Sequence, residues 1–124
     1  MMQSQEDKHS PSFSERELHY LMDRSLARLG FVCKDMLAHL MPVLFEFDGA
    51  YFYLSGWNLK HSQRFLQTQP EQQVTLLIDD VQDSSHWTLR GIEVTGIPET
   101  RLKGDYMYVR IRPLAKTSWG IHSK

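Results

Sequence analysis

The chain of 124 residues contains one cysteine, no long hydrophobic run and no excess of charge of either sign. A lone Cys33 excludes disulfides within the chain, and in its apolar surroundings the thiol is expected to behave as a small hydrophobic group. No apolar run approaches the roughly 20 residues that cross a bilayer, so we expect no membrane span. A net charge of −1 offers no field to attract nucleic acid. The polar N-terminus lacks the apolar segment of a secretion signal, which predicts a cytoplasmic protein.

Several patterns that mark familiar catalytic sites are also missing. The sequence has no cysteine pair, no His-Glu-x-x-His, no Gly-x-Gly-x-x-Gly after a strand and no Gly-x-Ser-x-Gly. Structural zinc sites, zinc proteases, dinucleotide-binding domains and α/β-hydrolases therefore lack their required spacing. The six histidines never fall at i and i+4, so the pattern predicts no preformed metal site, although histidines from different strands could converge.

The length fits one domain. Residues 1–12 are polar, contain Pro11 and show no period, which predicts a disordered N-terminal tail followed by a single domain over 13–124. A hydrophobic content of 41% can build one core. A core of that size is small, so we expect the domain to associate with a partner subunit.

The segment from His39 to Ser55 has the strongest strand pattern in the chain. Hydrophobic side chains alternate with polar ones up to Phe47, and the run 50–54 resumes as a second strand. Asp48-Gly49 between them suits a type I′ turn, so the segment predicts a β-hairpin. Pro42 cannot donate a hydrogen bond to a neighbouring strand, and we therefore expect a sheet edge or bulge there, with its backbone open to a ligand.

The rest of the chain predicts a mainly β protein with two short helices. Ser14 and Glu17 form a capping box, leucines follow at helical spacing to Leu29, and Gly30 is expected to end that helix. A second helix is expected between Asn58 and Pro70. Further strands are expected over residues 31–33, 74–78, 87–98 and 106–112, with glycines 91 and 96 marking bulges or close approaches and Pro113 ending the last strand. Six strands joined by short turns predict a small antiparallel barrel.

The start of the second expected helix is a candidate phosphate site. Lys60 and Arg64 lie on its first turns, where unpaired backbone N–H groups and the helix dipole attract anions. Charged residues at such positions can equally form an ordinary solvated helix face. The pattern alone leaves both interpretations open.

Four segments together resemble the pyridoxamine 5′-phosphate oxidase-like flavin-binding split-barrel superfamily, specifically its short members known as deazaflavin (F420)-dependent oxidoreductases. They are HLMPVLFEFDG at 39–49, VTLLIDDV at 74–81, WTLRGIEVTGIPE at 87–99 and VRIRPLAKTSWG at 109–120. The resemblance implies a six-stranded antiparallel split β-barrel that forms a homodimer. It also implies FMN, or alternatively coenzyme F420, bound at the dimer interface.

In such proteins the strand that corresponds to Met41, Pro42 and Val43 runs beside the flavin ring. The cations that bind the cofactor phosphate correspond to the segment from Ser55 to Arg64. The family usually has an Arg-Lys or Lys-Lys pair there, which this chain lacks, so one alignment places Arg64 at the key position and another places Ser62. We favour Arg64 with Lys60, because a phosphate dianion requires charged donors.

Other candidate residues remain open between two roles. Tryptophans 57, 87 and 119 could wall the cofactor or belong to the core, and we take Trp119 as the candidate cofactor contact. Arg90 and Arg112 could bind an anionic ligand or pair with Glu93 or Glu99 across neighbouring strands. The tight turn at 103–105 replaces a longer insertion found in many relatives, so substrate specificity cannot be carried over from it.

The resemblance favours a flavin- or deazaflavin-dependent oxidoreductase that transfers hydride to or from a small substrate. No side chain is assigned as a catalytic acid or base, because the cofactor carries the hydride. The main alternative is a non-catalytic flavin- or haem-binding carrier or sensor on the same barrel, since a fold does not fix a function. A plain interaction module with a vacant cleft is the third possibility.

Overall fold

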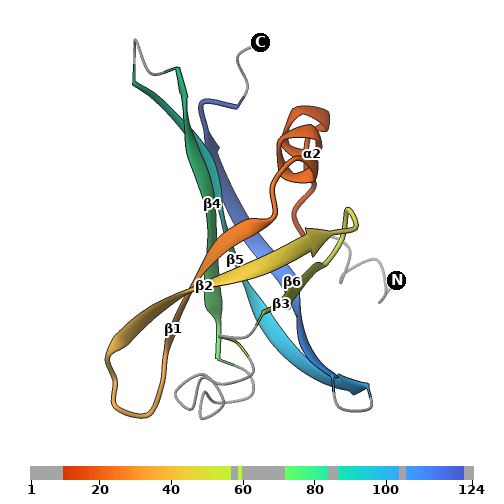
Figure 1. The fold of residues 1–124 in the computed structure, drawn as a ribbon, viewed down its shortest axis with the longest axis vertical. Coiled ribbons are helices and arrows are strands. Elements are labelled where there is room, and N and C mark those ends of the chain that lie inside the picture. Colours follow the sequence, from red (N-terminus) through yellow and green to blue (C-terminus); the bar gives the residue numbers. More distant parts are fainter. Residues whose placement is uncertain (1–9, 57–58, 60–71, 84–86, 104–105, 122–124) are drawn as a thin grey trace.

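The computed structural model describes residues 10–56, 59, 72–83, 87–103 and 106–121. Its helix is α2 (Glu15–Met22), and its six strands are β1 (Leu26–Val32), β2 (Ala38–Phe47), β3 (Phe52–Ser55), β4 (Val74–Asp83), β5 (Thr88–Lys103) and β6 (Tyr106–Trp119). The strands form one closed antiparallel barrel in the order β1-β2-β3-β6-β5-β4, with β1 also paired to β4 (Figure 1). The predicted mainly β, six-stranded antiparallel barrel is thus confirmed.

The strands differ greatly in length. β5 and β6 run side by side across the whole molecule, and β3 pairs with β6 over only a short stretch (Figure 1). The β1–β2 hairpin crosses this pair, with its turn at the lower left of the view and α2 at the upper right. Among the described residues no helix is long and apolar enough to span a bilayer.

The core fills the inside of the barrel. Every strand with described side chains contributes residues at alternate positions, as period-two packing requires. The largest fully buried side chains are Phe52, Leu21, Leu29, Leu54, Leu59, Leu76, Ile78, Ile92 and Ile111. Phe52 stacks on Phe47 at 4.1 Å between ring centroids, and Phe13 closes this aromatic group from the N-terminal side at 4.8 Å from Phe47.

The first helix is shorter than its leucine spacing predicts. The capping box is present, with Glu17 N–H donating to Ser14 Oγ at 3.1 Å and Ser14 N–H donating to Glu17 Oε1 at 2.9 Å. The helix nevertheless ends at Met22, and β1 begins at Leu26 rather than at residue 31. Ala27 and Leu29 are fully buried and alternate with exposed neighbours, so pairing with β2 and β4 overrides the helical spacing. Gly30 lies inside a strand and is not a helix stop.

The predicted hairpin is confirmed, but its turn is not of type I′. That turn requires positive φ at both central residues, and here only Gly49 has it, at 100°. Asp48 instead organises the connection through its side chain, because Oδ1 accepts hydrogen bonds from the N–H groups of Ala50 and Tyr51, each at 2.8 Å. Because the Asp48 side chain bridges the turn, the strands are separated by four residues and not by two.

The last strand continues past Pro113, contrary to the prediction. A bulge makes this possible: Thr95 faces Ala115 and Gly96 faces Pro113, which leaves Leu114 as an extra residue in β6. Pairing with β3 has already ended at Ile111, so the missing N–H of Pro113 interrupts no bond to that strand. The predicted close approach at Gly96 is confirmed, because a Cβ there would lie 2.5 Å from the carbonyl oxygen of Arg112.

The predicted second helix, from Asn58 to Pro70, lies outside the described residues except for one position. Leu59 is helical and has no exposed surface. A core residue therefore lies four positions after the end of β3.

Candidate functional site

The margin of β2 around Pro42 is the candidate cofactor site. β2 pairs with β1 from Ala38 to Leu44, but among the described residues it pairs with β3 only from Leu44 to Phe47. Residues 38–43 therefore have a neighbouring strand on one side only, within the part of the chain that the structure describes. Pro42, opposite Arg28 of β1, lies near the end of this stretch. Among the described residues, strand pairing at Pro42 is therefore with β1 alone.

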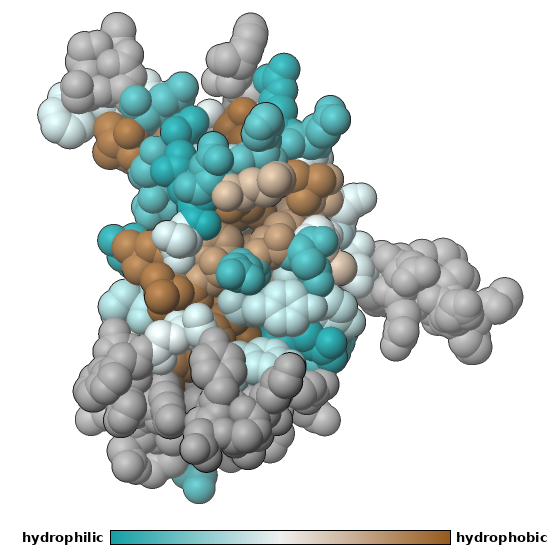
Figure 2. Space-filling model, turned by 45° about the vertical axis from the view of Figure 1, so that its right-hand side comes forward, coloured by the Kyte–Doolittle hydropathy of each residue, from teal (hydrophilic) through white to brown (hydrophobic). Residues whose placement is uncertain are grey.

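The two faces of this margin differ. Met41 packs against the core and Val43 is buried. On the outer face Leu40 is 75% exposed, and Leu44 and the facing Leu26 are about half exposed, at 51% and 50%. We call these three residues the leucine strip. Figure 2 shows that apolar side chains reach the surface across the middle of the molecule, below a hydrophilic upper region.

Ser55 adjoins the margin. It ends β3 directly opposite Leu44, so the predicted residues 41–43 and Ser55 are neighbours across two strands. A small groove of about 270 Å³ lies beside Ser55 and is lined also by Glu46, Tyr53, Leu54 and Tyr108. The chain turns away at Gly56, whose φ of 124° is one that L side chains rarely adopt.

Polar and charged side chains near this groove form hydrogen bonds with one another. Tyr53 Oη donates to Asp48 Oδ2 at 2.8 Å, and this bond raises the pKa of Tyr53. Burial opposes ionisation of Asp48, but the N–H donors of Tyr51 and Ala50 outweigh it and lower the pKa of that carboxyl group. Arg110 donates twice to Glu99 Oε1, at 2.6 and 2.8 Å, and lies 4.3 Å from the ring centre of Tyr51. These groups therefore brace the sheet beside the groove.

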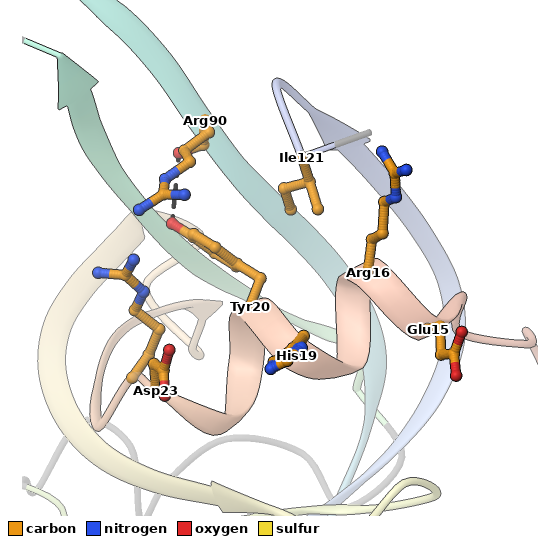
Figure 3. A pocket seen from close by; sticks show the side chains of 8 residues that line it. Glu15, Arg16, His19, Tyr20, Asp23, Arg90 and Ile121 are labelled. Carbon is orange, nitrogen blue, oxygen red and sulfur yellow. Dashed lines mark hydrogen bonds between the residues drawn. The ribbon is translucent and has the colours of Figure 1, made fainter. Parts of the chain in front are cut away.

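A larger groove, of about 610 Å³, lies where α2 meets β5 (Figure 3). Its lining residues are Glu15, Arg16, His19, Tyr20, Asp23, Arg24, Arg90 and Ile121. Tyr20 and Arg90 point toward one another from the helix and the sheet.

The polar groups of this groove meet at one carboxylate, that of Asp80. Tyr20 Oη donates to Asp80 at 2.7 Å, Arg90 donates two hydrogen bonds at 2.9 and 3.2 Å, and Arg24 lies 3.4 Å away. Burial and the adjacent carboxylate raise the pKa of Tyr20 far above its usual range. We call Tyr20, Arg24, Asp80 and Arg90 the aspartate clasp. It fastens α2 to β4 and β5.

The two arginines with open roles both pair with acids. Arg90 pairs with Asp80, directly opposite on β4, so pairing across strands was correctly predicted as a possibility but with the wrong acids, Glu93 or Glu99. Arg112 lies 3.9 Å from Glu99, one of its predicted partners. The register between neighbouring strands determines which acid each arginine meets.

Trp119 lies at the far end of β6 from the small groove. It faces Gly91, and its ring would lie 2.9 Å from a Cβ at that glycine. An extended strand from Tyr108 to Trp119 covers roughly 35 Å, so one chain does not bring Trp119 to Ser55. Lys60, Ser62 and Arg64, the predicted phosphate contacts, lie outside the described residues.

A third cluster lies at the β1–β2 turn and was not predicted from the sequence. The donor atoms of Cys33, Asp35 and His39 all lie within 4.8 Å of one another. The spacing Cys-x-Asp-x-x-x-His around a predicted turn was the available signal, because a turn folds its two flanks together.

Comparisons with known proteins agree on the fold. No family model matches the chain. A 5a,11a-dehydrotetracycline/5a,11a-dehydrooxytetracycline reductase from Streptomyces rimosus is 26% identical over 120 residues, which cover 88% of this chain and 84% of the reductase. A candidate pyridoxamine 5′-phosphate oxidase from Corynebacterium glutamicum superposes with a TM-score of 0.65 at 24% identity, covering 87% of this chain and 90% of that one.

Two more solved structures widen the range of activities on this fold. An F420 reductase has a TM-score of 0.61 at 17% identity, covering 80% of this chain and 94% of that one. The heme storage protein HutZ from Vibrio cholerae has a TM-score of 0.66 at 12% identity, covering 88% and 96%. At these identities the likeness establishes the split-barrel fold of the pyridoxamine 5′-phosphate oxidase-like proteins. The identity of the ligand has to be inferred from the residues of the site.

Proposed function

We propose that the protein is an oxidoreductase that binds FMN, or alternatively coenzyme F420, between two copies of the chain at the β2 margin. The observation that carries this proposal is that, among the described residues, the 38–43 stretch of β2 pairs with β1 only, with the leucine strip exposed beside it. A sheet edge of this kind offers backbone groups and apolar surface to a flat heteroaromatic ring. The reductase relative from Streptomyces rimosus and the F420 reductase fold support a redox role.

The size of the small groove supports a site shared between two chains. Its volume of about 270 Å³ is below the roughly 300–1,000 Å³ of sites that bury a whole ligand. A second copy would supply the missing wall. A homodimer would also cover the leucine strip, three exposed apolar side chains on the β1–β2 hairpin. Trp119 would then approach the cofactor from the partner copy.

Each part of the chain has a definite task in this proposal. The backbone of residues 41–43 would orient the ring, while Met41 and Val43 support it from the core side. Arg64 with Lys60, or Ser62 in the other alignment, would hold the phosphate near Ser55. When bound, the cofactor supplies the hydride chemistry, and the protein contributes orientation and exclusion of water. We expect the enzyme to work in the cytoplasm.

Titration with FMN and with F420 tests the binding step. We expect quenched cofactor fluorescence and one cofactor per chain in the dimer. Arg64→Ala should weaken binding by about 1.5–3 kcal/mol, because a charged hydrogen bond to the phosphate is lost. Arg16→Ala removes a cation from the exposed face of α2 and serves as the matched control. Absence of binding to both cofactors would contradict the proposal, and an unchanged affinity in Arg64→Ala would contradict the assigned cation.

A non-catalytic flavin or haem carrier is the second candidate. The heme storage protein with the same fold favours it. Reduction of the bound cofactor by a nicotinamide donor, followed by turnover with an electron acceptor, would establish the enzyme. Tight binding of haem with no turnover of bound FMN or F420 would establish the carrier.

A further inference from the structure

The β1–β2 turn brings together three side chains that commonly bind metals. Cys33 follows the last residue of β1, Asp35 lies in the turn, and His39 is on β2 opposite Phe31. Asp35 Oδ1 is 3.3 Å from Cys33 Sγ, and the two carboxylate oxygens are 3.2 and 3.1 Å from His39 Nε2. A thiol, a carboxylate and an imidazole thus point at one small volume.

The backbone fixes this arrangement before any ion arrives. Met36 N–H donates to the carbonyl of Cys33 at 2.9 Å, and Leu37 N–H donates to Asp35 Oδ1 at 2.9 Å. Met36 has a φ of 66°, which tightens the turn. The ring of His39 packs on Phe31 with centroids 5.6 Å apart. The donor atoms therefore sit on a short, well-connected loop.

The separations of Asp35 from Cys33 and from His39 are close to those of a tetrahedral zinc site. Bonds of about 2.3 Å to sulfur and about 2.0 Å to oxygen and nitrogen, at tetrahedral angles, place sulfur about 3.5 Å from oxygen and nitrogen about 3.3 Å from oxygen. The observed values are 3.3 Å and 3.1–3.2 Å. Only the distance from Sγ to Nε2, which is within 4.8 Å, has to shorten appreciably in a tetrahedral site.

We propose that Cys33, Asp35 and His39 bind one Zn²⁺ per chain, with water in the fourth position. A thiolate and an imidazole favour zinc over magnesium and calcium, which prefer oxygen ligands. Binding replaces the S–H proton of Cys33, which passes to solvent, and the imidazole and carboxylate bind through lone pairs. The site is separate from the aspartate clasp, since the turn and α2 lie at opposite ends of the hairpin (Figure 1).

The same contacts also serve the metal-free turn. Asp35 accepts hydrogen bonds from Leu37 N–H and Cys33 S–H, as acidic residues often do in turns. A turn of this kind needs only one side chain that accepts hydrogen bonds. What points to a metal is that a thiol, a carboxylate and an imidazole converge at the same place.

The test uses the full chain without an affinity tag. Zn²⁺ is titrated in competition with a chromophoric chelator, and Co²⁺ is used as a spectroscopic probe. We expect one ion per chain and a thiolate-to-cobalt charge-transfer band. Because Cys33 is the sole cysteine, that band identifies Cys33 as a ligand of the bound ion. Cys33→Ser should abolish the band, and His39→Gln should weaken Zn²⁺ binding more than about tenfold.

His19→Gln is the matched control, because His19 is an exposed histidine on α2. It should bind Zn²⁺ as the unmodified chain does. Zn²⁺ should raise the Tm of the unmodified chain and leave that of Cys33→Ser unchanged, provided both have the same Tm without metal. Absence of the charge-transfer band, or equal Zn²⁺ affinity of Cys33→Ser and the unmodified chain, would overturn the proposal. Neither result bears on cofactor binding.

Discussion

The two ends of the β1–β2 hairpin differ in how their side chains are used. At the α2 end, two arginines and a tyrosine share Asp80. Glu17, also on α2, accepts hydrogen bonds from Lys116 and Ser118 of β6, each at 2.7 Å. Toward the turn, Met36, Leu37 and Leu40 expose apolar surface, and residues 38–43 have a strand on one side only among the described residues.

The contrast distinguishes contacts that stabilise the fold from surface that is available to another molecule. Polar groups that are paired within the chain contribute to its stability. Apolar surface and a strand margin without a neighbouring strand contribute little to the stability of one chain, and another molecule can cover them. Substitutions at the α2 end should therefore change unfolding, and substitutions at the margin should change association.

The largest effect is expected from Leu40→Lys in the leucine strip. A lysine there would place a charge in the proposed interface and should weaken dimerisation by about 3 kcal/mol, more than a hundredfold. Sedimentation measures the association constant. Met22→Lys is the matched control, because Met22 is equally exposed but lies on α2. An unchanged dimer in Leu40→Lys would place the interface elsewhere and would remove the distinction drawn between the two ends.

The next effect is expected from Asp80→Ala in the aspartate clasp. The substitution leaves the guanidinium of Arg90 and the hydroxyl of Tyr20 without their shared acceptor, and the side chain of Asp80 is only 25% exposed. We expect a loss of about 2 kcal/mol in the free energy of unfolding, discounted for partial solvent screening. Urea unfolding measures it.

Asp79→Ala controls for the loss of a neighbouring carboxylate. Asp79 is 39% exposed and makes one 3.3 Å contact with Arg28, so its removal should cost less than about 0.5 kcal/mol. Equal losses in the two variants would show that the clasp contributes no more than an ordinary surface ion pair.

Acidic pH should lower the stability that the α2 end of the hairpin contributes. Hydrogen bonds from Arg90 lower the pKa of Asp80, and the contacts with Lys116 and Ser118 outweigh burial and lower the pKa of Glu17. A carboxyl group with a lowered folded-state pKa contributes stability above its unfolded-state pKa. That stability is lost as the pH falls through the folded-state pKa, so it should decline below about pH 4.

Urea unfolding of the unmodified chain and of Asp80→Ala at pH 7 and pH 3 measures this decline. The difference between the two should shrink at pH 3, because Asp80 takes up a proton more readily in the unfolded chain, where its pKa is not lowered, and this favours unfolding of the unmodified chain. A difference that stays constant would show that Asp80 acts through packing and not through its charge.

The sequence predicted features set by neighbouring residues better than features set by distant ones. The capping box at Ser14 and the alternation up to Phe47 are local, and both are present. The leucines from Leu18 to Leu29 fit the helical period, but pairing of β1 with two strands decides in favour of a strand. The continuation of β6 past Pro113 depends on a bulge opposite Gly96, which only the register of the sheet reveals.

The candidate site was predicted only in part, because only some of its features depend on residues that are neighbours in the sequence. Pro42 marks the sheet margin because proline lacks a donor, which is a local property. Which acid pairs with Arg90 depends on the β4–β5 register, and the separation of Trp119 from Ser55 depends on the length of β6. The assignment of the phosphate to Lys60, Ser62 or Arg64 stays a prediction. The Cys33, Asp35 and His39 cluster needed the geometry of its turn.

The smallest effect, and the one expected gain in stability, concerns Met36 in that turn. Its φ of 66° costs an L residue about 1–2 kcal/mol, whereas glycine adopts it freely at an entropic cost of about 0.5–1 kcal/mol. Met36 is 80% exposed, so little buried surface is lost. Met36→Gly should therefore stabilise the chain by about 0.5 kcal/mol, seen as a higher urea midpoint at an unchanged m-value.

The neighbouring Leu37→Gly is the matched control for that gain. Leu37 is also exposed but does not have a positive φ, so glycine brings only its entropic cost and should destabilise by about 0.5–1 kcal/mol. Opposite signs in adjacent residues would show that backbone strain, and not loss of an apolar side chain, governs the turn. A loss of stability in both would mean that the side chain of Met36 is held by contacts, which would place part of the chain's own stability at the end of the hairpin assigned here to partners.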